Sequence, residues 1–383
     1  MAEKPVGRRV AHLTSVHRWN DTRIYARMCR SLAEAGYDVH LVVAKDDLPA
    51  NASAYGVTVH AVPEAKKGRW ERATRTTKDV LEVARKLDAD IYHLHDPELL
   101  PIGLKLRKQG KKVIYDAHED LPATLVDKPW IPHAVGSVLA RPIGWVEQRL
   151  ASRMTAVIGA EERITVLFRR PGQPAISVHN YPRMADYPAP TDYRPRRESN
   201  LLVSFSGLNV HRCGDMVIRA ASLLEPKYDY RLVIAGISDG ESFLSAVRGL
   251  PAMDRMEYKG VLTRDQMNVY LYQARIAFVL YSNSPNHLHV RSNRFFEAMA
   301  AGVPVITADF PDWVQTVNGI GSGITVPSDD PAAIAQAVRK LWDDPDLAEH
   351  MGRQGRKAIE EKYNWEREQS RLLDLYRQLL GDG

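Results

Sequence analysis

The chain has 383 residues, of which 44% are hydrophobic and 26% are charged, and its formal net charge at pH 7 is +5. This composition is typical of a globular protein and excludes a disordered chain or a fibrous repeat. The length favours two domains of ordinary size.

Cysteine content and hydrophobic patterning indicate the cellular compartment of the protein. The two cysteines, Cys29 and Cys213, lie far apart in the chain, which argues against a disulfide framework or a thiolate metal site and fits a reducing cytoplasm. No stretch approaches the ~20 apolar residues that cross a bilayer, and the N-terminal segment lacks the apolar run of a signal peptide. We therefore expect a cytoplasmic protein whose membrane contact, where it exists, is peripheral at the inner face of the cell membrane.

The basic residues are unevenly distributed. The stretch from Arg141 to Arg197 carries ten arginines against five acidic residues. Such a stretch indicates either an anionic partner, for example a lipid-linked acceptor at a membrane surface, or only a solvated linker and helix face. Nucleic acid is not expected as a partner, because aromatic residues are not interleaved with the basic ones.

Along the chain, short runs rich in Val, Ile and Leu alternate with amphipathic helical patterns. This alternation is typical of βαβ units, so we predict an α/β fold with two parallel sheets. The predicted strands of the first half are 9–15, 38–44, 57–62, 90–95, 112–116, 155–159 and 175–179. Those of the second half are 201–207, 230–237, 276–282, 303–309 and 323–327.

A polar, proline-rich segment without periodicity, 182–200, indicates the linker between the halves. The predicted domains are therefore 1–185 and 186–364, followed by an amphipathic helix over 365–383. Ligands of such folds bind beyond the carboxyl ends of the strands, where polar residues become candidates for a site.

Polar residues follow the first predicted strand in the segment HRWNDTRIY, residues 17–25. Asn20, Asp21 and Arg23 could contact an acceptor or a donor phosphate, while Asp21 or Thr22 could instead only cap the next helix. Trp19 favours the first interpretation, because exposed aromatic rings commonly stack on sugars or partners.

His93, His95 and Asp96 end the strand 90–95, and His118 lies at the end of the next strand, so a metal site has to be considered. The two histidines at i and i+2 share one face of the strand, but the sequence offers no third and fourth ligands with matching spacing, and Pro97 constrains the loop. We expect no bound metal.

Two acidic residues near these strand ends have open alternatives. Asp96 could shape the side of the site that binds an acceptor or cap the helix that starts near Leu99. Glu119, which follows His118, could serve the acceptor or only orient a loop.

The segment SNRFFEAMAAGVPVI, residues 292–306, combines a short amphipathic helix with an abrupt stop. Ser292 can cap the helix and Gly302 fits its C-terminal end, so the helix is about ten residues long. Phe295, Phe296 and Met299 would be buried against the sheet, which leaves Asn293 and Glu297 on another face.

The start of this helix suits a nucleotide diphosphate. The free amides of its first turn and the positive end of the helix dipole favour an anion, and Arg291 and Arg294 add charge of the same sign. Glu297, one turn later, has two carboxylate oxygens that could accept hydrogen bonds from both ribose hydroxyls. The alternative is a capped structural helix that binds nothing.

Several segments together resemble the retaining glycosyltransferases of family 4, which have the GT-B architecture of two Rossmann-like domains. They are NDTRIYARMCRSLAEAGYDVHLV (20–42), DIYHLHDPELLP (90–101), VIYDAHEDLP (113–122), FSG (205–207), SNRFFEAMAAGVPVI (292–306) and YNWEREQSRLLDLY (363–376). The resemblance implies transfer of a sugar from a nucleotide diphosphate sugar to an acceptor, without a cofactor or a bound metal. It also implies that the N-terminal domain binds the acceptor, that the C-terminal domain binds the donor, and that the last helix crosses back to the first domain.

The resemblance assigns His118 to the donor sugar near the reacting carbon. The family also has a second glutamate, seven positions before the one matched by Glu297. This chain has His289 there, which could still hydrogen-bond a sugar hydroxyl or be only a loop residue. The choice of sugar is therefore in doubt. Retention implies that the acceptor attacks the anomeric carbon on the face from which the leaving group departs. A phosphate oxygen would then take the acceptor proton.

A second departure concerns the diphosphate. After the strand that ends at Gly207, the family places an arginine and a lysine where this chain has Leu208 and Cys213. Arg212 is the natural substitute because a guanidinium can contact two phosphate oxygens, and His211 is the second choice. Gly207 would let the backbone approach the phosphates, or mark only a turn.

Three readings of function remain. The resemblance favours a glycosyltransferase of cell-surface polysaccharide, lipopolysaccharide or other glycoconjugate assembly. A nucleotide-sugar 2-epimerase has the same architecture but needs no acceptor. A relative that binds nucleotide and has lost turnover would fit the replaced residues.

Overall fold

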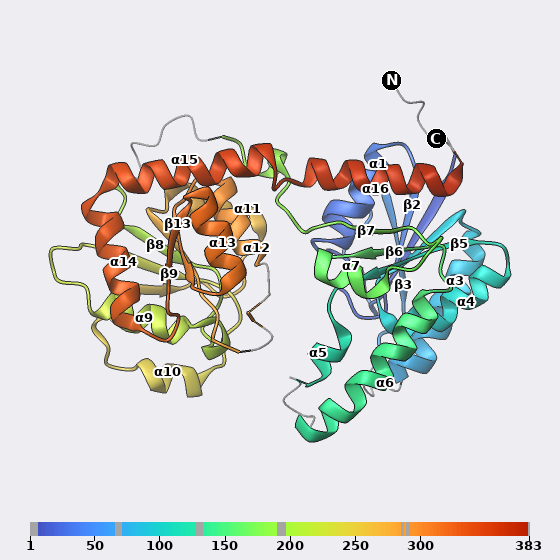
Figure 1. Cartoon of the computed structure of the whole chain (residues 1–383), viewed down its shortest axis with the longest axis horizontal. Coiled ribbons are helices and arrows are strands. Elements are labelled where there is room, and N and C mark those ends of the chain that lie inside the picture. Colours follow the sequence, from blue (N-terminus) through green and yellow to red (C-terminus); the bar gives the residue numbers. More distant parts are fainter. Residues whose placement is uncertain are drawn as a thin grey trace. The chain divides into compact units, whose positions relative to one another are not determined.

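The computed structural model describes residues 7–65, 71–126, 133–189, 197–284, 287–288 and 292–381. The chain divides into two compact units (Figure 1), with boundaries between Asn180 and Tyr181 and between Asn364 and Trp365. The boundaries expected from the sequence lay between residues 185 and 186 and between 364 and 365. The first unit contains the N-terminal segment and the C-terminal helix, and the second unit contains the residues between them.

The first unit is built on a parallel sheet in the order β3-β2-β1-β4-β5-β6-β7. Its strands are β1 (Arg9–Leu13), β2 (Asp38–Ala44), β3 (Val57–Val62), β4 (Ile91–Leu94), β5 (Lys112–Ala117), β6 (Ala156–Gly159) and β7 (Ala175–Ser177). Its helices are α1 (Arg30–Glu34), α3 (Thr77–Leu87), α4 (Leu100–Lys108), α5 (Leu121–Val126), α6 (His133–Ala151), α7 (Glu162–Phe168) and α16 (Trp365–Leu380).

Both faces of this sheet are covered by helices. Successive side chains of a strand point to opposite faces, so Val10 joins the cluster that includes residues of α16, while Ala11 joins the cluster that includes residues of α3 and α4. Figure 1 shows α1 and α16 on one side of this sheet and α3, α4 and α6 on the other. The continuous apolar runs of the sequence follow from this two-sided burial.

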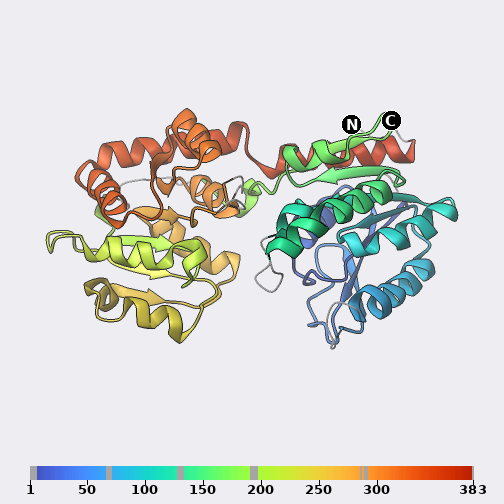
Figure 2. The same cartoon turned by 60° about the horizontal axis from the view of Figure 1, so that its bottom comes forward.

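The C-terminal helix α16 is an integral part of the first unit, as its red ribbon shows in Figure 2. Trp365 at its start is fully buried, and its indole Nε1 donates a hydrogen bond to Ser31 Oγ at 2.8 Å. Tyr376 is also fully buried and packs edge-on against Tyr37. The helix therefore completes the core of this unit.

The second unit has a parallel sheet in the order β10-β9-β8-β11-β12-β13. Its strands are β8 (Leu201–Ser204), β9 (Arg231–Ile234), β10 (Met256–Tyr258), β11 (Ile276–Val279), β12 (Val305–Ala308) and β13 (Gly323–Val326). Its helices are α9 (Gly214–Ser222), α10 (Glu241–Val247), α11 (Arg264–Gln273), α12 (Asn293–Ala300), α13 (Pro311–Ile320), α14 (Pro331–Asp343) and α15 (Pro345–Glu361). The three-residue edge strand β10 was not predicted from the sequence.

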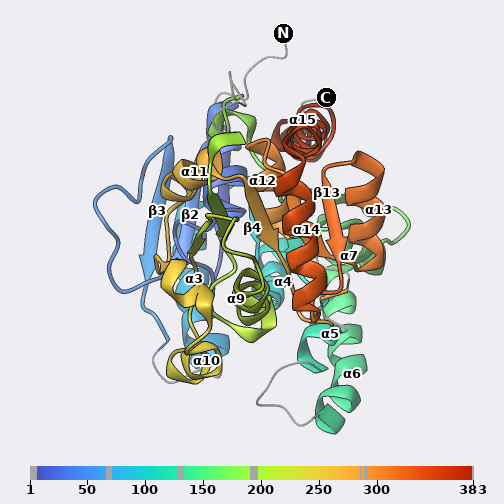
Figure 3. The same ribbon diagram turned by 90° about the vertical axis from the view of Figure 1, so that its left-hand side faces the viewer.

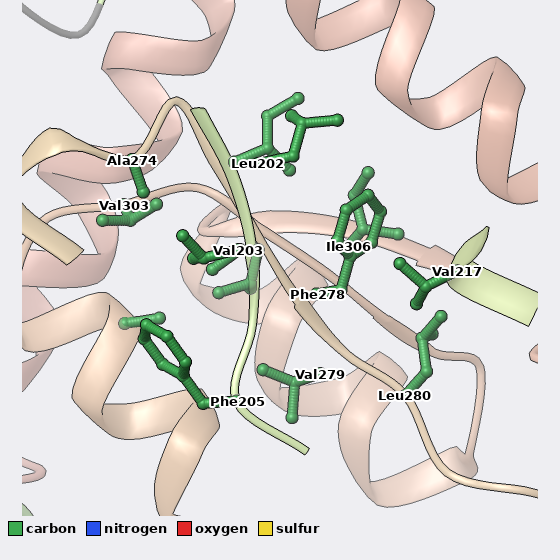
Figure 4. Packing of buried hydrophobic residues seen from close by; sticks show 14 of the residues in the cluster. Leu202, Val203, Phe205, Val217, Ala274, Phe278, Val279, Leu280, Val303 and Ile306 are labelled. Atoms are coloured by element: carbon green, nitrogen blue, oxygen red, sulfur yellow. The ribbon is translucent and has the colours of Figure 1, made fainter. Parts of the chain in front are cut away.

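The core of the second unit lies between its sheet and helices. Figure 4 shows Val203 of β8, Phe278 of β11 and Ile306 of β12 among its side chains, and all three are buried. Helices α9 and α14 pack against each other, as seen in Figure 3.

The beginning of the predicted linker belongs to this second core, which corrects the sequence analysis. Met184–Asp186 form a short 3-10 turn, Tyr187 is buried, and its carbonyl accepts a hydrogen bond from Arg356 Nη1 at 2.6 Å. Residues 190–196 lie outside the described residues.

Among the described residues, no helix combines the length and the apolar character needed to cross a membrane.

Candidate active site

In each sheet the chain reverses its direction of winding between two adjacent strands. These switch points lie between β1 and β4 in the first unit and between β8 and β11 in the second. Ligands of open parallel sheets bind beyond the carboxyl ends of the strands at such points. The residues that follow these four strands, and those after β5 and at the start of α12, form the candidate site in each unit.

Asp116, near the end of β5, anchors the site of the first unit. The carboxylate is fully buried and accepts two hydrogen bonds from Arg23, one from Nε at 2.9 Å and one from Nη2 at 2.6 Å. Arg23 Nη1 donates to the Val178 carbonyl at 2.6 Å and to Asn180 Oδ1 at 2.9 Å. The guanidinium of Arg23 is thus buried and engaged, so its predicted contact with an acceptor or phosphate is corrected to a positioning role.

Two histidines share this carboxylate. His118 Nε2 lies 3.0 Å and His95 Nδ1 lies 3.1 Å from Asp116 Oδ2. Burial by itself would raise the pKa of Asp116, but Arg23 and His118 hold that pKa well below its usual value. Asp116 is therefore a fixed negative charge that orients both rings. His118 is half-buried, so part of its ring remains accessible.

A chain of buried hydrogen bonds continues from His95 into the core. His95 Nε2 lies 2.8 Å from His12 Nδ1, and the Tyr376 hydroxyl lies 3.4 Å from His12 Nε2 and 2.8 Å from His93 Nδ1. Burial lowers the pKa of His12 and of His93 well below the usual value and that of His95 to about 4. These rings are neutral at pH 7, and they connect α16 to β1 and β4.

Two groups of side chains in the described residues have the spacing to hold a metal ion, with ligand atoms within 4.8 Å of one another: His12, His93 and His95, and His95, Asp116 and His118. The expectation that no third ligand lies near His93 and His95 is therefore wrong, because strand β1 supplies His12. Two contacts weigh against an ion. Arg23 already neutralises Asp116, and the His12–His95 hydrogen bond engages the nitrogens that face each other.

The segment after β1 folds onto its own polar residues. Asp21 Oδ1 accepts hydrogen bonds from the backbone amides of Arg23 and Ile24, so Asp21 caps the following helical segment. Asp21 Oδ2 also lies 3.6 Å from His17 Nδ1. Asn20 is exposed. Trp19 is half-buried and packs edge-on against Tyr25, so the expectation of an exposed aromatic ring is wrong.

Asp96 is buried at the end of β4. Its Oδ2 accepts hydrogen bonds from Thr14 Oγ1 at 2.8 Å and from the Ser15 amide at 2.6 Å, which ties β4 to the end of β1. Asp96 precedes a 3-10 turn but makes no side-chain cap bond to it, so the capping alternative is excluded. Glu119 is exposed.

A pocket of about 1160 Å³, open solvent included, lies at this edge of the first unit and is lined by Asp96, His118 and Glu119, among others. The structure thus brings three predicted residues of this domain to one cavity. Its wall also includes Tyr115 and Glu147, which the sequence analysis did not identify.

In the second unit, Gly207 is required by the turn that follows β8. Its φ is +89°, and a Cβ at this position would lie 2.2 Å from the Ile237 carbonyl oxygen. Close contact with the backbone after β9 therefore explains this glycine. Leu208 and Cys213, at the positions where the resemblance expects cations, are both buried.

Arg212, which ends the 3-10 turn Val210–Arg212, is directed to the start of α12. Its Nη1 donates a hydrogen bond to the Tyr281 hydroxyl, and its guanidinium carbon lies 4.8 Å from the centroid of that ring. The Tyr281 hydroxyl in turn donates to Ser292 Oγ at 3.2 Å. Arg212 and Ser292 are thus joined through Tyr281, which the sequence analysis missed although it follows β11 at the switch point.

Helix α12 has eight residues, Asn293–Ala300. Ser292 occupies the N-cap position, but its side chain makes no cap hydrogen bond, so the predicted capping is wrong and the first-turn amides stay uncapped by it. Gly302 ends the helix with φ of +73° and donates to the Met299 carbonyl, while Val303 donates to the Ala298 carbonyl. This Schellman arrangement confirms the predicted stop.

Glu297 is 5% exposed, and its Oε2 accepts a hydrogen bond from Arg294 Nη1 at 2.7 Å. Among the described residues, Oε1 has no hydrogen-bond partner. Asn293 is half-buried one turn earlier, and His211 is exposed beside Arg212. His289 and Arg291 lie outside the described residues. One oxygen of Glu297 is thus fixed by Arg294, and the other can accept a bond from a ligand.

Two family models match the chain. The model described as Glycosyl transferases group 1 matches residues 192–358, and the one described as Glycosyltransferase Family 4 matches residues 22–197. The chain has two units, each built on a parallel sheet, and each unit is matched by one of these models. This arrangement is the GT-B architecture. Together the two models cover residues 22–358, so both units of the chain match glycosyltransferase families.

Individual relatives agree with this assignment. A capsular polysaccharide biosynthesis glycosyltransferase of Staphylococcus aureus, CapM, is 26% identical over 45% of this chain and 44% of its own length. The D-rhamnosyltransferase WbpZ of Pseudomonas aeruginosa is 32% identical over 33% of this chain and 32% of its own. The matched regions thus span less than half of either relative.

The structure of Anabaena Alr3699/HepE in complex with UDP and glucose has the same fold, with a TM-score of 0.72 and 12% identity. The superposition covers 97% of this chain and 100% of that chain.

The ion pair of Asp116 gives a prediction for stability. Asp116→Asn leaves the guanidinium of Arg23 buried without a countercharge, so we expect it to lower the free energy of unfolding by ~3–5 kcal/mol in urea titrations. Asp38→Asn removes the carboxylate of an exposed ion pair with Arg9 in the same sheet and should cost less than ~1 kcal/mol. Equal effects of the two substitutions would show that the buried pair carries no special constraint.

Proposed function

We propose that this chain transfers a sugar from a nucleotide diphosphate sugar to an acceptor with retention of the anomeric configuration. The observation that supports this proposal best is the contact of Arg212 through Tyr281 with Ser292, at the start of a helix whose Glu297 keeps one oxygen available. A cation, first-turn amides that the Ser292 side chain does not cap, and a carboxylate one turn later suit a diphosphate next to a ribose. The similarly folded HepE has been observed with UDP and glucose.

In the proposed reaction, the bond between the anomeric carbon and the diphosphate oxygen breaks while the acceptor oxygen attacks from the same face. Arg212 and the first-turn amides of α12 stabilise the negative charge that develops on the leaving diphosphate. A phosphate oxygen of that leaving group takes the acceptor proton, so the reaction needs neither a protein base nor a resident metal. Glu297 holds the ribose, and His118 contacts the donor sugar.

The biological setting that we propose is assembly of a cell-surface polysaccharide, lipopolysaccharide or related glycoconjugate. The names of the relatives CapM and WbpZ support this setting. Helix α6 adds an argument for contact with a membrane, because Val138 is 73% and Trp145 is 66% exposed on it, with the exposed Arg141 and Arg149 nearby. An interfacial tryptophan with basic neighbours suits an anionic lipid surface.

Removing the Glu297 carboxylate should weaken nucleotide binding. We expect Glu297→Ala to reduce the affinity for UDP, as the nucleotide diphosphate probe, by ~1–3 kcal/mol in calorimetry, because the ribose loses a charged acceptor. Glu225→Ala, which removes the acid of the exposed pair Glu225–Arg339, is the matched control and should leave the affinity unchanged. Unaltered binding by Glu297→Ala would end its ribose role.

Removing the Arg212 guanidinium should affect turnover more than binding. With a donor sugar identified by a thermal-shift screen, we expect Arg212→Ala to lower kcat by about 10²-fold, because the leaving group loses its charge stabilisation. Arg339→Ala is the control from the same exposed pair. Wild-type turnover in Arg212→Ala would show that another residue, for example His211, stabilises the charge on the leaving diphosphate. If the protein binds UDP but acts on no donor sugar, the interpretation as a non-catalytic relative is favoured instead. The buried Leu208 and Cys213, at positions where the family has cations, are consistent with that interpretation.

The membrane proposal predicts co-sedimentation with vesicles of phosphatidylcholine and phosphatidylglycerol at low salt, and less at high salt. Trp145→Asp should abolish this binding, whereas Val269→Asp, at an exposed apolar position of α11, should leave it intact. Absence of binding to these vesicles at low salt would refute the proposal.

A further inference from the structure

The pocket of the first unit is acidic. Its described lining contains the four carboxylates of Asp96, Glu98, Glu119 and Glu147 and the three imidazoles of His17, His95 and His118, but no lysine or arginine. A phosphate or carboxylate of a ligand beside Glu147 would meet the charges of its own sign on Glu119 and Asp120. The pocket therefore favours a ligand part that is neutral or cationic.

Glu147 is the residue that α6 contributes to the described lining of this pocket. It is 5% exposed, and its Oε1 accepts a hydrogen bond from the Tyr115 hydroxyl at 2.6 Å. Among the described residues, Oε2 has no hydrogen-bond partner. Because Glu147 lines the cavity, this oxygen can accept a hydrogen bond from a ligand.

The wall around Glu147 is formed by helices α5 and α6. Helices α5 and α6 pack closely because position 144 is glycine, where a Cβ would lie 2.5 Å from Pro122 Cγ. This contact holds Leu121 and Leu125 of α5 against the pocket beside Glu147. These half-buried leucines place apolar surface next to the carboxylate, where a charge interaction is screened less than in open water.

The protonation of this pair fits a cationic partner. Burial raises the pKa of Glu147 to about 7, the Tyr115 hydrogen bond opposes this rise, and Asp120 and Glu119 add to it. Burial also raises the pKa of Tyr115 well above its usual value, so its hydroxyl remains a donor. A positive group at Glu147 would favour the ionised carboxylate and relieve the repulsion from Glu119 and Asp120.

We propose that this pocket receives an acceptor that carries a free amino group, and that Glu147 binds its ammonium and thereby selects an amino sugar over an acylated or phosphorylated one. This inference rests on the proposed glycosyl transfer and names the chemical class of its acceptor. Glu147 acts as a specificity-determining residue. The ammonium only positions the acceptor, whose hydroxyl oxygen still forms the new bond to the anomeric carbon.

The test measures binding of three probes to the full chain by calorimetry or ligand-observed NMR. Glucosamine carries the amino group, N-acetylglucosamine lacks its charge, and glucose 6-phosphate carries the opposite charge. We expect glucosamine to bind about 10-fold more tightly than N-acetylglucosamine, because an ammonium–carboxylate hydrogen bond is charge-assisted, and glucose 6-phosphate to bind most weakly. Equal or reversed affinities in the wild-type chain would overturn the inference.

Variants assign the preference to its residue. Glu147→Gln retains the shape and an acceptor for Tyr115, and it should remove the ~10-fold preference for glucosamine because the charge is lost. Glu82→Gln, at an exposed ion pair of α3, should leave it unchanged. A preference that survives in Glu147→Gln would contradict the role of this carboxylate.

Binding of UDP, measured on the same samples, separates the two proposals. If UDP binds and the phosphorylated sugar is preferred, the acceptor class is wrong while the donor function stands. If neither UDP nor the other nucleoside diphosphates bind to the wild-type chain, the donor function fails, and the three sugars still decide whether the pocket prefers an amine.

Discussion

The buried ion pair between Asp116 and Arg23 is the constraint on which the carboxyl edge of the first sheet depends. It joins β5 to the segment after β1, and through Val178 and Asn180 it reaches the chain that follows β7. A buried pair gains little net stability against an apolar replacement, but losing one partner is expensive. Its effect is therefore geometric, because any displacement of one element would leave a charge unpaired in the core.

The same carboxylate determines the chemistry around it. With Arg23 already neutralising Asp116, the His95 and His118 rings are oriented by a fixed acceptor, and burial keeps His95 neutral at pH 7. The hydrogen-bond chain then reaches Tyr376 of α16. The C-terminal helix is thus coupled to the edge of the sheet by polar contacts in addition to its apolar face, which explains why a sequence-distant segment belongs to this unit.

How far the sequence predicts this structure depends on whether a feature is local. The apolar runs that define β2 and β3 are bounded by polar residues and turns, so their limits were predicted to the residue, as was the Schellman stop at Gly302. Strands of the second half were predicted too long. Buried apolar residues such as Phe205 and Leu280 follow the last residue that pairs with a neighbouring strand, so the apolar pattern extends beyond the strand. Strand β10 was missed because Met256–Tyr258 is an edge strand without an apolar run.

The site residues that were misjudged owe their roles to distant partners. Arg23 and Trp19 have the local pattern of exposed ligand contacts, yet Asp116 and Tyr25 determine where their side chains lie. Glu147 was not recognised as a site residue because it lies in a helix of the arginine-rich stretch. The sequence of that helix does not indicate that Tyr115, on a distant strand, is its hydrogen-bond partner. Tyr281, in contrast, could have been identified, because it follows a strand that borders the switch point.

Tyr281 also explains how the second unit can bind an anion without the cations that the resemblance expects at positions 208 and 213. Cys213 has φ of +52°, and this left-handed conformation begins α9 directly after the 3-10 turn that ends at Arg212. The turn keeps Cys213 buried while Arg212 reaches the Tyr281 ring and hydroxyl. Because those contacts already restrict the guanidinium, less conformational entropy remains to be lost when it meets a phosphate. The cation at position 212 can therefore bind a diphosphate although the family has its cation one residue later, provided that the Tyr281 hydroxyl orients the guanidinium.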